Sequence, residues 1–83
     1  MRILVETRSG SVTVDAKDVY QEILVRIAIA CSWGERRVTI YFLDDDFAFG
    51  HVKPIVEKLS KHTWFKICAE GSALIRTHIT IEY

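Results

Sequence analysis

The sequence predicts a two-layer α/β sandwich, in which two helices cover one face of a mixed sheet of four or five strands. The main observation is the segment 36–71, which contains a strand, an acidic turn, a proline-containing helix and a second strand. This is a βαβ unit, and its crossover implies parallel strands. The remaining apolar periodicities complete a βαβαββ order with an extra N-terminal strand.

Composition restricts the class of protein. The 83 residues suffice for one domain, 1–83, and 49% hydrophobic with 27% charged residues is typical of a globular chain. Eleven basic and eleven acidic side chains cancel, which disfavours strong binding to nucleic-acid phosphates but allows a local basic patch. We find no signal peptide and no apolar run of membrane-spanning length, and therefore expect a cytoplasmic protein without membrane contact.

The first fifteen residues have two interpretations. Residues 2–8 have the β-branched character of a strand, residues 9–11 form a turn signal, and residues 12–15 alternate again. We favour a hairpin over a single strand that is followed by an irregular lead-in.

A helix is predicted from Asp15 or Asp18, either of which can cap its first turn, to about Ser32. Its core-facing stripe and its other faces are both apolar, which predicts cover by the second helix or by another subunit in addition to the sheet. Many β-branched residues keep a strand interpretation open, although the length of the segment disfavours it. The stripe comprises Val19, Ile23, Ile27 and Ala30, and the other apolar positions are Leu24, Val25, Ala28, Ile29 and Cys31.

The next elements are predicted from the residues that begin and end them. Gly34 suits the left-handed end of the first helix, after Trp33. Residues 38–43 alternate with both rows apolar, as in an interior strand. The second helix starts either at Asp46 as N-cap or near Pro54 in its first turn. Strands are then expected over 63–69 and 73–83, with a turn at 70–72 and one face of the last strand in water.

No residue pattern indicates catalysis, and we predict no catalytic residue, metal or cofactor. The aspartates at 44–46 are typical of a solvated turn that caps a helix, and the three histidines lack the spacing of zinc ligands. The candidate thiols are Cys31 and Cys68. Both lie in apolar surroundings in the sequence, so we expect reduced, buried side chains.

Short motifs in the chain resemble the small TusA/SirA-like sulfur-carrier proteins over roughly residues 12–83. The resemblance implies a two-layer βαβαββ domain. The matching pieces are Val14-Asp15-Ala16, Gly34-Glu35, Asp45-Asp46 with Ala48, Pro54, His62 and Glu70-Gly71.

The sulfur-binding motif of that family is missing. The family carries sulfur on a Cys-Pro-x-Pro motif at the start of the first helix, where the helix dipole activates a thiolate. Residues 16–22 contain neither Cys nor Pro. The resemblance therefore implies a degenerate, non-catalytic relative that acts through protein–protein binding or self-association, with a link to sulfur-transfer systems as a further expectation.

A second resemblance gives the alternative function. The same strand and helix order is similar to Alba-type nucleic-acid-binding proteins and to the C-terminal domain of translation initiation factor three. Residues 17–19 and 79–82 look Alba-like, but the acidic turn at 44–46 replaces the basic loop expected there.

These interpretations define two candidate surfaces. We expect a protein partner or a homo-oligomer such as a dimer, with nucleic acid as the disfavoured alternative. The candidate binding surface comprises Lys17, Tyr20, Asp45, Asp46, His51 and Lys53, and the candidate self-association surface comprises Leu24, Val25 and Ile29.

Overall fold

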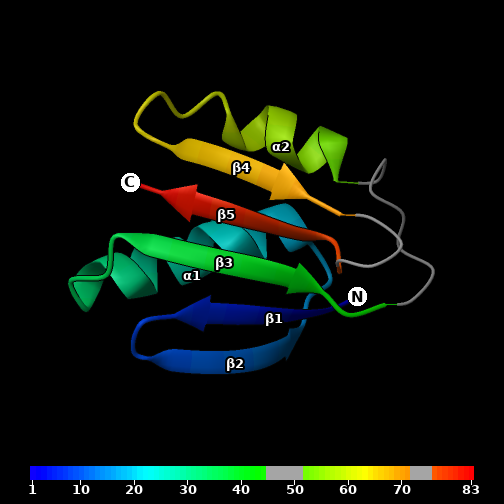
Figure 1. Ribbon diagram of the computed structural model, residues 1–83, viewed down its shortest axis with the longest axis horizontal. Coiled ribbons are helices and arrows are strands. Elements are labelled where there is room, and N and C mark those ends of the chain that lie inside the picture. The colour runs from blue at the N-terminus through cyan, green and yellow to red at the C-terminus, as the bar shows by residue number, and fades with distance from the viewer. Residues whose placement is uncertain (45–51, 72–75) are drawn as a thin grey trace.

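The computed structural model describes residues 1–44, 52–71 and 76–83 (Figure 1). A five-stranded sheet carries two helices, so the predicted two-layer sandwich is confirmed. The elements are β1 (Arg2–Thr7), β2 (Gly10–Asp15), α1 (Val19–Ser32), β3 (Arg37–Phe42), α2 (Lys53–Leu59), β4 (Lys66–Glu70) and β5 (His78–Glu82).

The sheet is antiparallel at each of its described pairings, in the order β2-β1-β3-β5-β4, so the expectation of a mixed sheet is wrong. The two crossovers nevertheless link strands that run in the same direction: β2 and β3 through α1, and β3 and β4 through α2. Each parallel pair is separated by an inserted strand, β1 in the first case and β5 in the second. The βαβ units are therefore split, and parallel strands do not become hydrogen-bonded neighbours.

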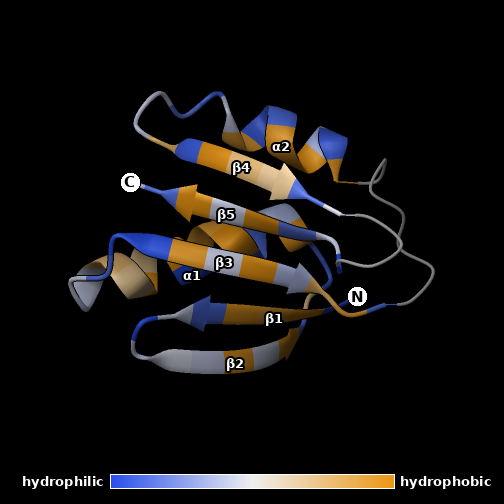
Figure 2. Cartoon of the chain, in the orientation of Figure 1, coloured by the Kyte–Doolittle hydropathy of each residue, from blue (hydrophilic) through white to orange (hydrophobic). Residues whose placement is uncertain are grey.

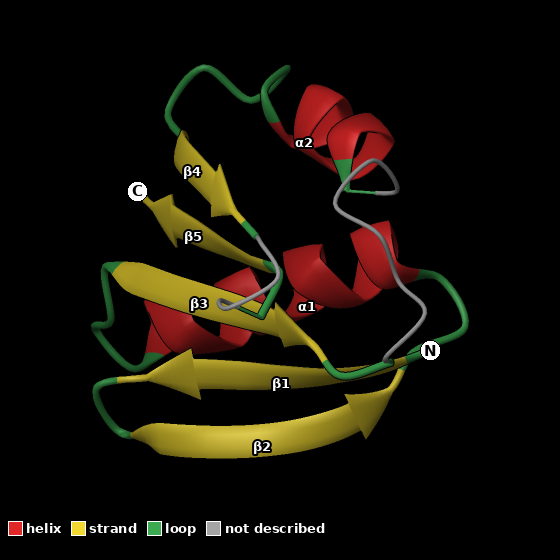
Figure 3. Ribbon diagram, turned by 45° about the vertical axis from the view of Figure 1, so that its right-hand side comes forward, coloured by secondary structure: helices red, strands yellow, loops and turns green. Residues whose placement is uncertain are grey.

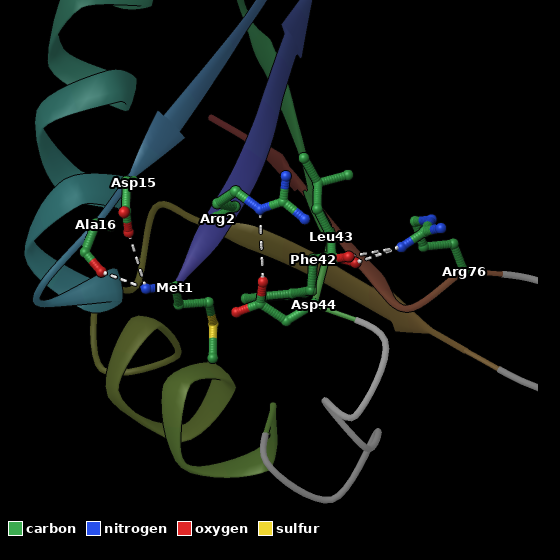
Figure 4. A network of polar contacts seen from close by, with 8 residues as sticks. All are labelled: Met1, Arg2, Asp15, Ala16, Phe42, Leu43, Asp44 and Arg76. Atoms are coloured by element: carbon green, nitrogen blue, oxygen red, sulfur yellow. Dashed lines mark hydrogen bonds and ion pairs between the residues drawn. The ribbon is translucent and has the colours of Figure 1, made fainter.

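The predicted N-terminal hairpin is confirmed. Thr7 is paired with Gly10 across a loop of two residues, and Gly10 has a φ of +146°, which L side chains rarely adopt. At the open end of the hairpin, the Met1 amino group lies 3.0 Å from Asp15 Oδ1 and donates to the Ala16 carbonyl at 3.2 Å (Figure 4). These contacts fix the chain where it leaves β2 for α1.

Polar contacts also fix the end of β3, at the same end of the sheet as Met1. Arg76 Nη1 donates to the carbonyl oxygens of Phe42 at 3.3 Å and Leu43 at 3.2 Å, and Arg2 Nε lies 3.8 Å from Asp44 Oδ1 (Figure 4). The guanidinium of Arg76 thereby binds the carbonyl of the last residue of β3 and the carbonyl that follows it.

Both ends of α1 use the residues that the sequence indicated. Asp18, rather than Asp15, is the N-cap, and its Oδ1 accepts from the Gln21 backbone N–H at 3.2 Å. At the other end, Gly34 has a φ of +80° and its N–H donates to the Cys31 carbonyl, while the Glu35 N–H donates to the Ala30 carbonyl. This pair of bonds is a Schellman motif, which requires the left-handed conformation that glycine tolerates.

The second helix begins at Lys53 and has Pro54 in its first turn, which confirms the second of the two predicted starts. Asp46 lies outside the described residues. The strand predicted over 63–69 begins only at Lys66, because turn bonds continue past the helix. The His62 N–H donates to the Leu59 carbonyl and the Phe65 N–H to the His62 carbonyl, which holds Thr63 and Trp64 in turns.

One face of the sheet and one side of both helices form the core. Register places Ile3 opposite Phe42, Val5 opposite Ile40, and Ile40 opposite Ile79, all on the helix side. Hydrophobic and hydrophilic residues alternate along the strands, and the helices lie on one side of the sheet (Figures 2 and 3). The helices contribute Ile23, Ile27, Ala30 and Leu59 to this core, and Val52, just before α2, joins them.

The opposite face of the sheet, which we call the open face, carries no helix among the described residues. One row across it runs from Thr13 through Leu4, Tyr41 and His78 to Glu70. The rings of Tyr41 and His78 are tilted, with their centroids 5.2 Å apart. The open face is therefore a mixed polar and aromatic surface.

Candidate interaction surface

The outer side of α1 exposes a strip of three large apolar residues. Val25, Ile29 and Trp33 follow one another at intervals of four residues, which places their side chains along one line of the helix surface. Val25 is 50% exposed, Ile29 45% and Trp33 75%. We call Val25, Ile29 and Trp33 the apolar strip.

A groove runs between the apolar strip and the hairpin. Val12 lies on the helix side of β2, opposite the buried Val5, yet it remains 43% exposed because α1 does not reach over it. The groove has a volume of about 340 Å³ and contacts both α1 and the β1–β2 hairpin. We call it the hairpin groove; its principal apolar walls are Val12, Ile29, Ala30 and Trp33.

Two charged side chains, Arg26 and Glu35, line the hairpin groove, and both have polar partners. Arg26 Nε lies 3.3 Å from Glu22 Oε2, one turn earlier on α1. Glu35 accepts a hydrogen bond from the Ser9 hydroxyl at the hairpin loop. Because Arg26 is paired with a carboxylate and Glu35 is hydrogen-bonded to a hydroxyl, the groove presents an apolar wall with a polar margin, which is the composition of a protein–protein contact.

The strand beside the groove is an edge of the sheet. β2 pairs with β1 on one side and ends the strand order on the other. Its residues 10–14 are Gly, Ser, Val, Thr and Val, without a charge or a proline. Edge strands usually carry lysine, proline or a bulge that blocks further pairing. β2 has none of these side chains in that stretch, and the other edge strand, β4, carries Lys66 and Glu70.

The predicted self-association residues divide between two environments. Val25 and Ile29 belong to the apolar strip. Leu24 is half-buried and packs against the core, so its side chain supports the fold. Trp33 and Val12 were not in the predicted surface. The four-residue interval from Ile29 to Trp33 is a sequence signal that could have identified Trp33, because it continues the interval from Val25.

The predicted binding surface is only partly described. Lys17 and Lys53 are exposed, whereas Asp45, Asp46 and His51 lie outside the described residues. Tyr20 is half-buried, and its hydroxyl lies 3.1 Å from His62 Nε2. Its side chain therefore contributes to packing between the helices.

The expectation that both thiols are buried is wrong: Cys31 and Cys68 are free and exposed. In β4 the alternation turns Ile67 and Ala69 towards the helices, so Cys68 lies on the open face, opposite Thr80. Cys31 follows the buried Ala30 on α1. Because consecutive residues point in different directions around a helix, its side chain is turned away from the sheet. Apolar neighbours in sequence did not imply an apolar environment in either case.

A second hollow, of about 650 Å³, lies at the end of the sheet near the hairpin loop. Its charged lining mixes both signs: Glu6 and Glu35 with Arg8, Arg36 and Arg37. Arg37 is already engaged with Glu82 at 3.1 Å. Because acidic and basic groups both line this hollow, it lacks the uniform charge that would select one kind of ionic ligand.

Two further findings concern the part of the chain that the structure describes. It contains no group of three or more His, Cys, Asp or Glu side chains arranged to hold a metal ion. Neither described helix has both the length and the hydropathy needed to cross a membrane.

Comparison with known proteins gives no relative: no family model, curated protein or solved structure matches this chain. The resemblances to TusA/SirA-like and to Alba-type proteins therefore stay predictions, and the surface itself has to indicate the function.

Proposed function

We propose that this protein is a non-catalytic domain that acts through protein–protein contact, and that it self-associates through the apolar strip and the hairpin groove. The observation that carries the proposal is that Trp33, Ile29 and Val12, all substantially exposed, line one groove beside an edge strand whose residues 10–14 carry no charge. Contiguous apolar surface of this kind on a small domain marks an interaction site.

The strip contains the residue types that dominate binding energies. Tryptophan is enriched among residues whose truncation costs about 2 kcal/mol or more at protein interfaces. Trp33 stands at the end of α1 next to the hairpin groove, where a partner would cover both. Ile29 lies one turn earlier and provides a smaller apolar contact at the same wall.

The link to sulfur transfer rests on the family resemblance alone. Sulfur carriers of the TusA/SirA type hold their cysteine at the start of the first helix. Cys31 is in the last turn of α1, at the opposite pole of the helix dipole. A carrier role through Cys31 or Cys68 would need a different geometry, and we propose that the domain works without it.

A second candidate function is nucleic-acid binding through the open face. The observation in its favour is the Tyr41–His78 ring pair, because exposed aromatic rings can stack on bases. The basic residues on that face alternate with acidic ones, as in the Arg37–Glu82 pair. Retention on heparin that disappears between low and moderate salt would support this candidate over self-association.

The test of the proposal is the molar mass in solution. We expect multi-angle light scattering to give a concentration-dependent mass that approaches twice the 9.6 kDa of one chain. Ile29→Glu places a charge in the strip, and Val25→Glu does the same at the previous turn. Both are expected to give the monomer mass with an unchanged circular dichroism spectrum.

The matched control is Ala28→Glu, which adds the same charge to an exposed neighbour outside the strip. It is expected to self-associate like the wild type. A wild-type protein that remains a monomer at every accessible concentration would overturn the proposal. Equal loss of association in Ala28→Glu would show that added charge, rather than the strip, decides the mass.

A further inference from the structure

The free edge of β2 has a definite pattern of backbone groups. Thr7 and Gly10 are opposite one another at the two-residue loop, so they form a hydrogen-bonded pair, and such pairs alternate along an antiparallel ladder. Accordingly, the N–H and C=O groups of Gly10, Val12 and Val14 point towards β1. Those of Ser11, Thr13 and Asp15 point away from the sheet.

Two hydrogen bonds at the far end of the hairpin agree with this assignment. The Met1 carbonyl accepts from the Ala16 N–H at 2.8 Å, so Met1 bonds towards the β2 side. The Arg2 carbonyl accepts from the Leu43 N–H at 3.1 Å, so the next residue bonds towards the β3 side. The alternation therefore holds along the whole of β1, and the outward groups of β2 are fixed.

The side chains of β2 are compatible with a second β2. Val12 and Val14 lie on the helix side, while Ser11, Thr13 and Asp15 lie on the open face. Residues opposite one another in an antiparallel pair share a face. When Thr13 of one copy is opposite Thr13 of another, Val12 of each copy is opposite Val14 of the other. Ser11 of each copy is likewise opposite Asp15 of the other.

This register uses all the outward backbone groups. With Thr13 at the centre, Ser11, Thr13 and Asp15 all fall in hydrogen-bonded pairs, which gives six interchain bonds. A shift that places Val12 opposite Val12 moves Asp15 opposite Ser9, which belongs to the hairpin loop. The register centred on Thr13 also brings no like charges together, because the strand's one charged side chain faces a serine.

We infer that two copies of this chain pair through β2, antiparallel and centred on Thr13, to form a continuous ten-stranded sheet. The inference rests on the proposed self-association and specifies its geometry. A two-fold axis that passes midway between the two copies of Thr13 makes the contact self-complementary, as closed dimers require. It is a strand-addition contact in which backbone bonds supply affinity and side chains supply register.

The same geometry covers the apolar residues. Val12 lies on the paired strand and faces the helix layer, so the hairpin groove of one copy is next to that of the other across the axis. Ile29 and Trp33 of the apolar strip form the helix wall of that groove. Removal of these side chains from water would therefore add to the six backbone bonds.

Cysteine cross-linking tests the register. Paired residues in a hydrogen-bonded antiparallel position have Cα atoms about 5.5 Å apart, within the range that a disulfide spans. In a background with Cys31→Ser and Cys68→Ser, Thr13→Cys is expected to form an interchain disulfide on oxidation with diamide. The matched control is Ser11→Cys, whose two copies would be about 14 Å apart and would not cross-link.

A proline variant tests the backbone bonds. The Thr13 N–H faces the free edge, so Thr13→Pro leaves the β1–β2 pairing intact, and proline is tolerated at an outward-facing edge position. We expect a normal circular dichroism spectrum and a dimer on the order of tenfold weaker or more, because two interchain bonds are lost at the axis.

The outcomes separate the two proposals. If the Thr13→Cys variant cross-links and the Ser11→Cys variant does not, and the Thr13→Pro dimer is weakened, pairing through β2 is supported. A dimer that keeps its affinity in Thr13→Pro, or that cross-links equally through Ser11→Cys, overturns the pairing and leaves self-association standing. A wild type that is monomeric throughout overturns both.

Discussion

The Tyr20 hydroxyl and His62 Nε2 are 3.1 Å apart, although the two residues are separated by 42 positions in the sequence. The contact joins the first turn of α1 to the turn after α2. Lys58 Nζ lies 5.5 Å from the centre of the Tyr20 ring, and the His62 ring is 5.0 Å from that of Phe65. This polar contact and the rings around it hold the two helices together over the sheet.

The Tyr20–His62 contact can be measured by a double-mutant cycle. We expect Tyr20→Phe and His62→Ala to couple by about 0.5–1.5 kcal/mol in the free energy of unfolding, the usual net contribution of one hydrogen bond. Urea unfolding of the four proteins measures it. Tyr41→Phe, on the open face, is the control and is expected to be additive with His62→Ala. A coupling indistinguishable from that control would mean that the contact adds no stability.

The end of α1 depends on the backbone conformation of Gly34. At a φ of +80°, a β-carbon is strained although no atom lies within 4 Å of its position. Gly34→Ala is therefore expected to lower the free energy of unfolding by about 1–2 kcal/mol. Gly34→Asn is the matched comparison, because asparagine tolerates the left-handed region better, and its loss should be smaller. A loss in Gly34→Asn as large as that in Gly34→Ala would contradict φ as the cause.

Tyr83 links stability to pH. Burial raises the pKa of its phenol above the ordinary 10.0, and the nearby Cys31 and Glu35 charges raise that pKa further. Between pH 10 and the folded pKa, the unfolded chain loses the proton that the folded chain keeps. The associated stability is thus fully present below pH 10 and is lost as the pH rises through the folded pKa.

Tyr83→Phe checks this linkage. The Tyr83 hydroxyl is buried without a hydrogen-bond partner in the described part of the chain, so the variant is expected to be as stable as the wild type at neutral pH. Above pH 10 it should lose less stability than the wild type in urea unfolding. Ultraviolet titration of the variant should show one fewer phenol that ionises above the ordinary pKa of tyrosine. Parallel losses of stability above pH 10 would contradict the assignment.

Both thiols are expected to react in the folded protein. Because Cys31 and Cys68 are exposed, Ellman's reagent should titrate two thiols per chain without denaturant, and Cys31→Ser or Cys68→Ser should each leave one. Thiols that react only after denaturation would contradict the exposure. Intact-mass spectrometry after treatment with a persulfide donor extends the experiment, because a stable one-sulfur adduct on one thiol would favour a carrier role over the non-catalytic one.

Local signals in the sequence were sufficient for several separate features. Asp18 and Gly34 mark the two ends of α1, and Pro54 marks the first turn of α2, because capping and proline geometry depend on a few neighbouring residues. Alternation in residues 78–82 correctly placed Ile79 and Ile81 inside. Each of these features is decided within about one turn or one strand of the chain.

The sheet order and the groove could not be predicted in the same way. Nothing local in residues 2–7 indicates that β1 pairs with β3 and enters the sheet between β2 and β3. The hairpin groove exists only because that insertion places β2 outside the cover of α1. Val12 alternates like an interior strand residue, and its exposure follows from a pairing between segments about 35 residues apart.

The position of β3 determines how this domain opens. β3 is the end of one crossover and the start of the other, and it pairs with β1 on one side and β5 on the other. Neither half of the chain can detach without breaking a ladder on this strand. Amide hydrogen exchange should therefore be slowest in β3 and should proceed there only by opening of the whole domain, so that the two split units behave as one cooperative body.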